Sequence, residues 1–382
     1  MPSSTSSSET PEDQYARETA ADRPGVAQPV PLRPVPAHAW GAILLGALVL
    51  LAVLLAGWEA YWRGFGVTPS IRNSYGLWAI QRRRLDAGEG AATVLLGSSR
   101  TYFDLQLPVW ERLSGRRPVQ LSYEGTSPLT AVEDLAADPN FTGRLIIGVA
   151  PGLFFSGAGF AKDVAHYTHK QSPAQRVGQW LSMNFIEPYV AFYDGDFALK
   201  TVLARQPWPQ RPGKFWFTSV RKLAIYDAGR NAYLWDKVAT DPAYRELARN
   251  IWREGFVVRS GDPSAQEMLK SEKEQIERSV KALAQLRQHG VQVLFARLPS
   301  DGEYLAYEER YFPRQRSWAG LLAATGAAGL YFSDYPELRG YYLPEWSHMT
   351  RAEAERFTVA FYHIVERDFW GAQVKPAAGM GH

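Results

Sequence analysis

A serine follows an apolar run in a way that suits nucleophilic chemistry. The tetrapeptide Gly-Ser-Ser-Arg at 97–100 comes directly after residues 93–96, which predict a buried strand. Ligands and catalytic groups of open α/β sheets gather at the carboxyl ends of the strands, where backbone N–H groups could also hold an oxyanion. Ser99 is therefore a candidate nucleophile, although Gly and Ser also fill ordinary turns.

A histidine near the C-terminus could supply the base that a serine hydroxyl needs. His348 lies between Pro344 and a predicted helix cap at Thr350. Glu345 lies three residues earlier, so its carboxylate can reach the imidazole within a single turn. Asp334, further back along the chain, is the alternative acid. A histidine in such a loop is also commonly an ordinary surface group.

Further polar residues suggest binding rather than proton transfer. Arg100 and Arg297 follow predicted strands and are candidates for binding a substrate. Arg100 could also donate to an oxyanion, and Arg297 could equally form a structural ion pair. His166 and His169 would share a helix face with Asp163 nearby, a spacing that is compatible with a metal. No further ligand is in view, so we predict neither a metal nor another cofactor.

The elements that must position these residues alternate between strand and helix. Apolar, β-branched runs predict strands at 93–96, 118–121, 145–149, 291–296 and 329–332. Helix starts are marked by Ser127, followed by a proline, and by two Ser/Thr-x-x-Glu capping boxes, at 264–267 and 350–353. This alternation predicts an α/β fold, a three-layer sandwich with a mainly parallel sheet.

The middle of the chain differs from this pattern. Trp, Tyr, Phe and Arg dominate residues 156–261 without strand alternation, which predicts a helical insertion. Its aromatic side chains could stack on sugar rings or pack in a core. They include Trp180, Tyr189, Phe192, Tyr193, Trp208, Phe215 and Trp216.

An uncharged run near the N-terminus predicts a membrane helix. Residues 39–58 carry no charge and would span roughly 30 Å as a helix, the thickness of a bilayer core. Trp40 lies at one end, and Trp58, Tyr61 and Trp62 lie at the other, as amphipathic rings do at membrane interfaces. The leader is long and acidic, which favours a retained anchor over a cleaved signal peptide. A simple count of the flanking arginines puts the C-terminal side of the helix in the cytoplasm. Long domains, however, translocate largely regardless of charge, so the sequence leaves the orientation of the helix in the membrane open.

Composition sets further bounds. The net charge of +3 without a long block of one sign argues against nucleic acid as a partner. The absence of cysteine excludes disulfides and thiolate metal sites, and suits an oxidising compartment. The predicted organisation is a disordered tail (1–36), a transmembrane helix (37–62), a connector (63–90), an α/β domain (91–155 and 262–370), the insertion (156–261) and a flexible tail (371–382).

The order of these motifs resembles the SGNH, or GDSL-like, hydrolase superfamily over residues 90–155 and 262–365. Gly97-Ser98-Ser99 is similar to its nucleophile turn with Ser in place of Asp, and Gly125 to its oxyanion glycine. The pair Glu345 and His348 is similar to its acid-x-x-His motif with Glu in place of Asp. The resemblance implies Ser99 as nucleophile, His348 as base, Glu345 as orienting acid, and the N–H groups of Ser99 and Gly125 as oxyanion hole. The family's third motif carries an Asn that has no counterpart in residues 148–151.

The two-serine turn also resembles membrane-tethered members that handle acyl groups on cell-envelope polymers, such as alginate acetylation proteins and the D-alanyl transfer protein of teichoic acids. The resemblance implies a membrane-anchored serine esterase or O-acyltransferase with a periplasmic or extracellular domain. Its substrate would be an acyl ester or acylated polysaccharide at the cell surface, and its partner a membrane acyltransferase. The missing Asn leaves an alternative, a non-catalytic SGNH-like protein that binds polysaccharide or that acyltransferase.

Overall fold

The computed structural model describes residues 36–159, 161, 163–206, 221–257 and 263–371. The chain divides into an N-terminal unit that ends at Gly57 and a second unit that begins at Trp58. The predicted tail at 1–36 lies outside the described residues except for Pro36, and the tail at 371–382 lies outside them except for Gly371.

The first long helix, α2 (Trp40–Gly64), covers the uncharged run. Among the described residues it is the one helix that is long and apolar enough to cross a membrane. Its large apolar side chains from Ile43 to Leu55 are exposed in the isolated chain. The predicted span of 37–62 is therefore shifted by two or three residues, and the helix meets the length requirement for a bilayer.

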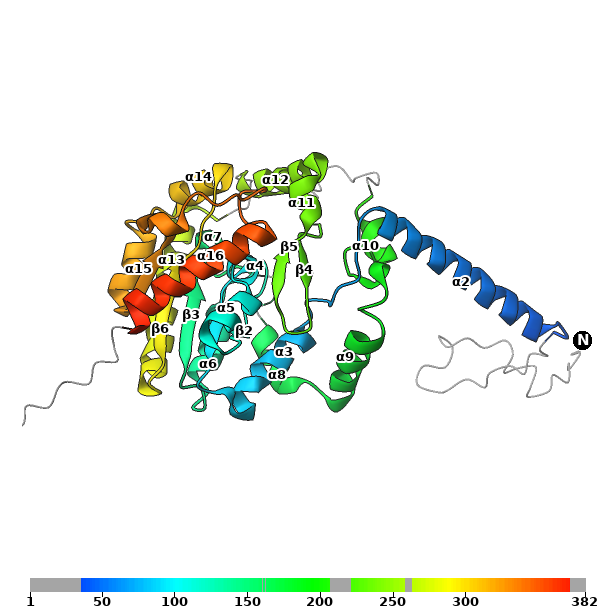
Figure 1. Ribbon diagram of the computed structural model, residues 1–382, viewed down its shortest axis with the longest axis horizontal. Coiled ribbons are helices and arrows are strands. Elements are labelled where there is room, and N and C mark those ends of the chain that lie inside the picture. Colours follow the sequence, from blue (N-terminus) through cyan, green and yellow to red (C-terminus); the bar gives the residue numbers. More distant parts are fainter. Residues whose placement is uncertain (1–35, 160, 162, 207–220, 258–262, 372–382) are drawn as a thin grey trace, which may run out of the picture. The chain divides into compact units, whose positions relative to one another are not determined.

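The second unit contains a five-stranded parallel sheet in the order β2-β1-β3-β6-β7. Figure 1 labels three of its strands, β2, β3 and β6. Its strands are β1 (Thr93–Leu96), β2 (Val119–Gln120), β3 (Arg144–Gly148), β6 (Gln292–Arg297) and β7 (Ala328–Tyr331). All five predicted strands are confirmed within one or two residues. From β1 the chain passes to β2 on one side, and it then continues with β3 on the other side of β1. Sheets with such a reversal bind ligands in the crevice at the carboxyl ends of the strands where the order reverses, here β1 and β3.

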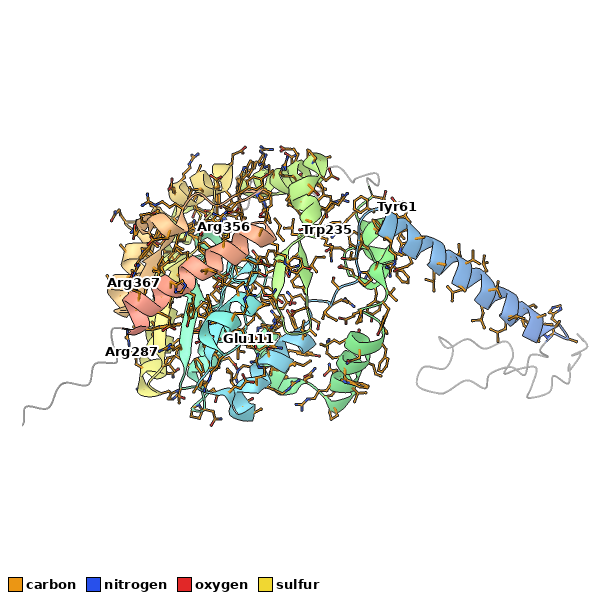
Figure 2. All side chains as sticks on the ribbon, in the orientation of Figure 1. Tyr61, Glu111, Trp235, Arg287, Arg356 and Arg367 are labelled. Atoms are coloured by element: carbon orange, nitrogen blue, oxygen red, sulfur yellow. The ribbon has the colours of Figure 1, made fainter. Side chains whose placement is uncertain are left out.

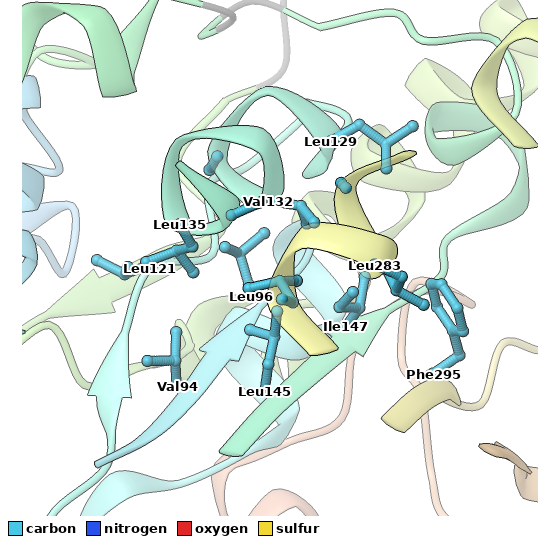
Figure 3. Close-up of a cluster of buried hydrophobic side chains, with 14 of the residues drawn as sticks. Val94, Leu96, Leu121, Leu129, Val132, Leu135, Leu145, Ile147, Leu283 and Phe295 are labelled. Carbon is cyan, nitrogen blue, oxygen red and sulfur yellow. The ribbon is translucent and has the colours of Figure 1, made fainter. Parts of the chain in front are cut away.

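Alternate residues of the strands belong to two hydrophobic clusters. Val94 and Leu96 of β1 pack with Leu129 and Val132 of α6 and with Leu283 of α13 (Figure 3). Leu95, which points the other way, belongs to a cluster with the apolar residues of α5 and α16. The helices of this region are α3 (Tyr75–Arg84), η1 (Leu85–Glu89), α4 (Ser99–Asp104), α5 (Leu107–Ser114), α6 (Leu129–Ala136), α7 (Pro151–Phe154), α13 (Ala265–Gln288), α14 (Gly302–Tyr311), α15 (Ser317–Thr325), η3 (Phe332–Asp334), η4 (Pro336–Leu338), α16 (Arg351–Ile364) and η5 (Val365–Trp370).

The described part of the aromatic middle, within residues 156–257, contains the predicted helices and also a hairpin that the prediction missed. Its elements are α8 (Val164–Lys170), α9 (Pro173–Phe185), η2 (Ala191–Tyr193), α10 (Leu199–Ala204), β4 (Ala224–Tyr226), β5 (Ala232–Leu234), α11 (Asp236–Thr240) and α12 (Pro242–Phe256). Strands β4 and β5 are antiparallel and only three residues long, too short to produce a clear alternation in the sequence. Trp235, which follows β5 and is labelled in Figure 2, belongs to a third hydrophobic cluster with Trp62, Phe103 and Phe197.

The predicted helix caps have mixed outcomes. Ser264 and Glu267 form both halves of a capping box at the start of α13. Thr350 accepts a hydrogen bond from the N–H of Glu353, which is one half of the predicted box. The prediction that Ser127 caps α6 is wrong, because the helix begins one residue later with Pro128 at the cap position.

Candidate active site

Ser99 is the first residue of α4, directly beyond β1. Ser98 occupies the N-cap position with extended backbone and is buried, whereas Ser99 is only half-buried. The backbone N–H of a first helical residue has no partner inside the helix. The turn therefore places Ser99 at the carboxyl edge of the sheet, with a backbone N–H that no carbonyl of the helix accepts.

Two glycines allow α4 to approach the sheet closely. A Cβ built at Gly97 would lie 2.2 Å from Oγ1 of Thr101, and one built at Gly148 would lie 1.7 Å from the same atom. Any larger residue would displace α4 from the ends of β1 and β3. Gly148 thus has a packing role. The two residues that follow it, Val149 and Ala150, are apolar and buried, whereas the SGNH pattern has an Asn at this place.

The pairing of β1 and β2 continues beyond the two strands, toward the turns that contain Ser99 and Gly125. The N–H of Tyr123 donates to the carbonyl of Gly97 at 3.0 Å, so residues 97 and 123 lie side by side. Ser99, at the start of α4, and Gly125, in the turn after β2, each follow this hydrogen bond by two residues in the sequence. Gly125 has φ of +56°, a conformation that favours glycine.

Glu345 and His348 form the hydrogen-bonded pair that their spacing predicts. Oε1 of Glu345 lies 2.9 Å from Nδ1 of His348 and accepts the backbone N–H of the same residue at 2.6 Å. Burial raises the pKa of Glu345, but the charge and the hydrogen bonds of His348 lower this pKa by more than burial raises it. The net pKa of Glu345 therefore lies below its usual value. An ionised carboxylate only accepts, so the Nδ1 atom of His348 is the donor in this hydrogen bond.

His348 packs against the helix that begins at Ser99. Its ring lies 4.6 Å from the ring of Phe103, centroid to centroid. Ser99 and Phe103 are four residues apart, so they share one face of α4. Nε2 of His348 is buried and has no hydrogen-bond partner in the described part of the chain. The structure thus brings a histidine with an unpaired basic nitrogen to the face of α4 that starts with the candidate nucleophile.

The predicted insertion contributes to this site, which the sequence did not indicate. Nε1 of Trp252, in α12, donates to Oε2 of Glu345 at 2.6 Å. Arg249 and Arg253 of the same helix stack on the ring of Trp346, at 4.9 and 4.8 Å from its centroid. Trp346 has φ of +72°, a backbone conformation that is rare for a bulky residue and costs free energy. The contacts around Trp346 must therefore hold its backbone in this conformation.

A second buried carboxyl group, Asp104, lies beside the pair. Its Oδ1 accepts the N–H of Met349 at 3.0 Å, and its Oδ2 is among the buried atoms that lack a partner in the described chain. Burial raises the pKa of Asp104 to about 7, against the opposing charges of His348 and Arg100. Asp104 is the last residue of α4, five residues after Ser99, and sequence reasoning did not single it out.

Arg100 and Arg297, the candidates for substrate binding, share one buried carboxylate. Both are buried, and both bind Glu308, Arg100 Nη1 at 2.8 Å and Arg297 Nη2 at 2.7 Å. Arg100 Nε also donates to Ser347 Oγ at 3.2 Å. For Arg297, the structural ion pair that the sequence left open is therefore the arrangement observed.

Asp334 is engaged elsewhere. It forms two hydrogen bonds with Arg314, at 2.7 and 2.6 Å, on an exposed surface, whereas Glu345 contacts the imidazole. His169 binds Asp134 at 2.6 Å. No group of three His, Asp or Glu residues suited to a metal occurs in the described ranges.

The aromatic residues of the insertion do not behave as one group. Trp180 and Tyr189 are exposed, Phe192 packs at the edge of the third cluster, and Arg72 stacks on Tyr193. The remaining predicted sugar-binding residues, Trp208, Phe215 and Trp216, lie outside the described residues.

A hollow of about 500 Å³ lies at the opposite edge of the sheet, where Thr93 begins β1, and is lined in part by Arg84 and Arg117. It is far along the strand from Ser99 and plays no part in this site. Compared with known proteins, the chain matches no family model and no curated protein.

Proposed function

We propose that the chain is a membrane-anchored serine esterase or O-acyltransferase of SGNH type that modifies a cell-surface polysaccharide. The observation that carries the proposal is the Glu345–His348 pair, with its unpaired Nε2 on the Ser99 face of α4. The strand order and the two clusters on opposite sides of β1 support a three-layer arrangement of that family.

The proposed chemistry begins with attack of Ser99 Oγ on an ester carbonyl. His348 Nε2 accepts the hydroxyl proton, and Glu345 stabilises the imidazolium that results. The negative charge that develops on the carbonyl oxygen would be held by the N–H groups of Ser99 and Gly125. Collapse of this intermediate releases the alcohol, which takes its proton from His348. Water or a sugar hydroxyl then attacks the acyl-serine by the same steps in reverse.

A second candidate function is non-catalytic binding of polysaccharide or of a membrane acyltransferase. The observation that favours it is the apolar pair Val149 and Ala150 at the place where an SGNH enzyme has its oxyanion-donating Asn. Loss of one such donor typically lowers the rate by about 10²–10³-fold. In this alternative Ser99 would be unreactive.

A fluorophosphonate probe, which reacts with activated serines, distinguishes the two functions. We expect it to label the wild-type chain and Ser98→Ala, its adjacent matched control, but not Ser99→Ala. The melting temperature of Ser99→Ala should stay within a few degrees of wild type because the side chain is small and half-buried. Labelling that is absent from the wild type favours the binding protein, and labelling that depends on Ser98 moves the nucleophile by one residue.

The proposed location is a single-pass anchor with the soluble unit in the periplasm or outside the cell. A reporter that is active only in an oxidising compartment, fused after His382, should be active. A cytoplasmic reporter that is active in its place contradicts the location and the polysaccharide substrate together.

A further inference from the structure

Helix α9 has its apolar face directed away from the protein. Val177, Trp180, Leu181 and Phe185 lie at the spacing that forms one stripe of a helix, and between 45% and 62% of each is exposed. None of the thirteen residues of this helix is buried. A helix on the surface of a soluble domain normally shows the opposite arrangement.

The side of α9 that faces the protein is polar. Oε1 of Gln179 accepts a hydrogen bond from Ser74 at 2.7 Å, and the hydroxyl of Ser182 donates to Glu187 at 2.6 Å. These polar contacts fix which side faces out, so the exposure of the apolar stripe is built into the fold. Arg176 is the single charged residue in the helix.

The segment that follows α9 is bonded to the end of the predicted membrane helix. Arg63, in the last turn of α2, donates to the carbonyl of Tyr189 at 2.8 Å. Glu59, one turn earlier, accepts the N–H groups of Ala191 at 2.9 Å and Phe192 at 3.1 Å. The chain would leave a bilayer near these residues, and α9 ends only four residues before Tyr189 in the sequence.

We propose that the outward face of α9 lies in the interfacial layer of the lipid bilayer that α2 crosses. This interfacial contact rests on the membrane anchoring included in the proposed function, and is independent of the chemistry at Ser99. A bilayer is the occupant that fits best because the stripe combines Trp180 with aliphatic residues and Tyr189, 65% exposed, follows it, and amphipathic rings favour this layer. Leu199 and Leu203 of α10 add two more exposed apolar side chains close along the chain.

The consequence is that the soluble unit has a fixed inclination to the membrane. A helix bonded through Gln179 to the connector at Ser74 cannot insert without orienting the whole unit. This differs from a flexible tether, which would allow the unit to rotate freely above the surface.

Because the chain contains no cysteine, single labelling sites can be introduced in the full-length protein. Leu181→Cys and Phe185→Cys place an environment-sensitive fluorophore on the outward face. Leu48→Cys places it in α2, and Lys270→Cys, whose parent side chain is 78% exposed on α13, is the matched control. Each variant is reconstituted at about one chain per vesicle in phosphatidylcholine, with or without brominated lipids that quench from the membrane.

We expect brominated lipid to lower the emission at positions 48, 181 and 185 by about twofold or more and to leave position 270 unchanged. Quenching at position 48 without quenching at 181 and 185 overturns the contact of α9 while leaving the anchor intact. Protection of 181 from aqueous iodide without lipid quenching assigns the face to a protein partner or a second copy, and also overturns it. Absence of quenching at position 48 removes both the anchor and the contact.

Discussion

The substitution Glu345→Gln tests the proposed site most directly because both carboxylate oxygens are occupied as acceptors. Oε1 accepts from the backbone and ring of His348, and Oε2 accepts from Trp252 at 2.6 Å. A glutamine has one acceptor oxygen and one donor nitrogen. In one orientation the amide N–H of the glutamine faces the indole N–H of Trp252, and in the other it faces the backbone N–H and the ring of His348. Two donors therefore oppose each other in either orientation, unless the imidazole changes its tautomer.

The expected loss follows from these contacts. Without the negative charge, the imidazolium that forms during attack by Ser99 loses its stabilising partner, and a loss of about 100-fold in kcat corresponds to about 2.7 kcal/mol. The unsatisfied buried N–H should lower the free energy of unfolding by about 1–3 kcal/mol, which is too little to unfold a unit of this size.

The assay is the rate of hydrolysis of a simple acetyl ester by the full chain, with thermal melting measured in parallel. Asp334→Asn is the matched control, because Asp334 is a surface carboxylate bonded to Arg314 and its loss should leave the rate nearly unchanged. A larger effect from Asp334→Asn would move the orienting acid to that residue. Negligible effects from both, together with an unaffected His348→Ala variant, would refute the triad and favour the binding protein.

Three further outcomes follow from the same contacts. Trp252→Phe removes one donor to the orienting carboxylate but keeps an aromatic ring, so kcat for the acetyl ester should fall about tenfold with KM unchanged; an equal rise in KM would indicate a binding role. Asp104 keeps its proton to about pH 7 in the folded chain but releases it near its ordinary pKa when unfolded, so its contribution to stability is lost as pH rises through 7. Asp104→Asn should therefore flatten the pH dependence of urea unfolding between pH 4 and 8, by roughly 2–4 kcal/mol, and an unchanged profile would show that this carboxyl is ionised throughout. Glu308→Gln leaves Arg100 and Arg297 without a buried counter-charge and should cost about 3–5 kcal/mol, a fall in melting temperature of roughly 6–20 °C, whereas a shift below 2 °C would contradict the ion-pair assignment.

Local features of the sequence were sufficient for the α/β class, the five strands of the sheet and the charge-free helix. Burial of a parallel strand on both sides requires short apolar runs such as 93–96, and a bilayer span requires about twenty uncharged residues, so both leave direct marks in the chain. The contact of Glu345 with His348 was also predictable, because a three-residue offset needs no tertiary folding.

Contacts between distant residues required the tertiary structure. Trp252 reaches Glu345 from 93 residues earlier in the chain, and Glu308 binds Arg100 from 208 residues later, so no local spacing signals either. The same holds for the outward face of α9, where an amphipathic stripe marks a helix but the sequence does not say which side meets the protein. Periodicity fixes relative positions within one element, whereas the partner of each face is chosen by the packing of the whole chain.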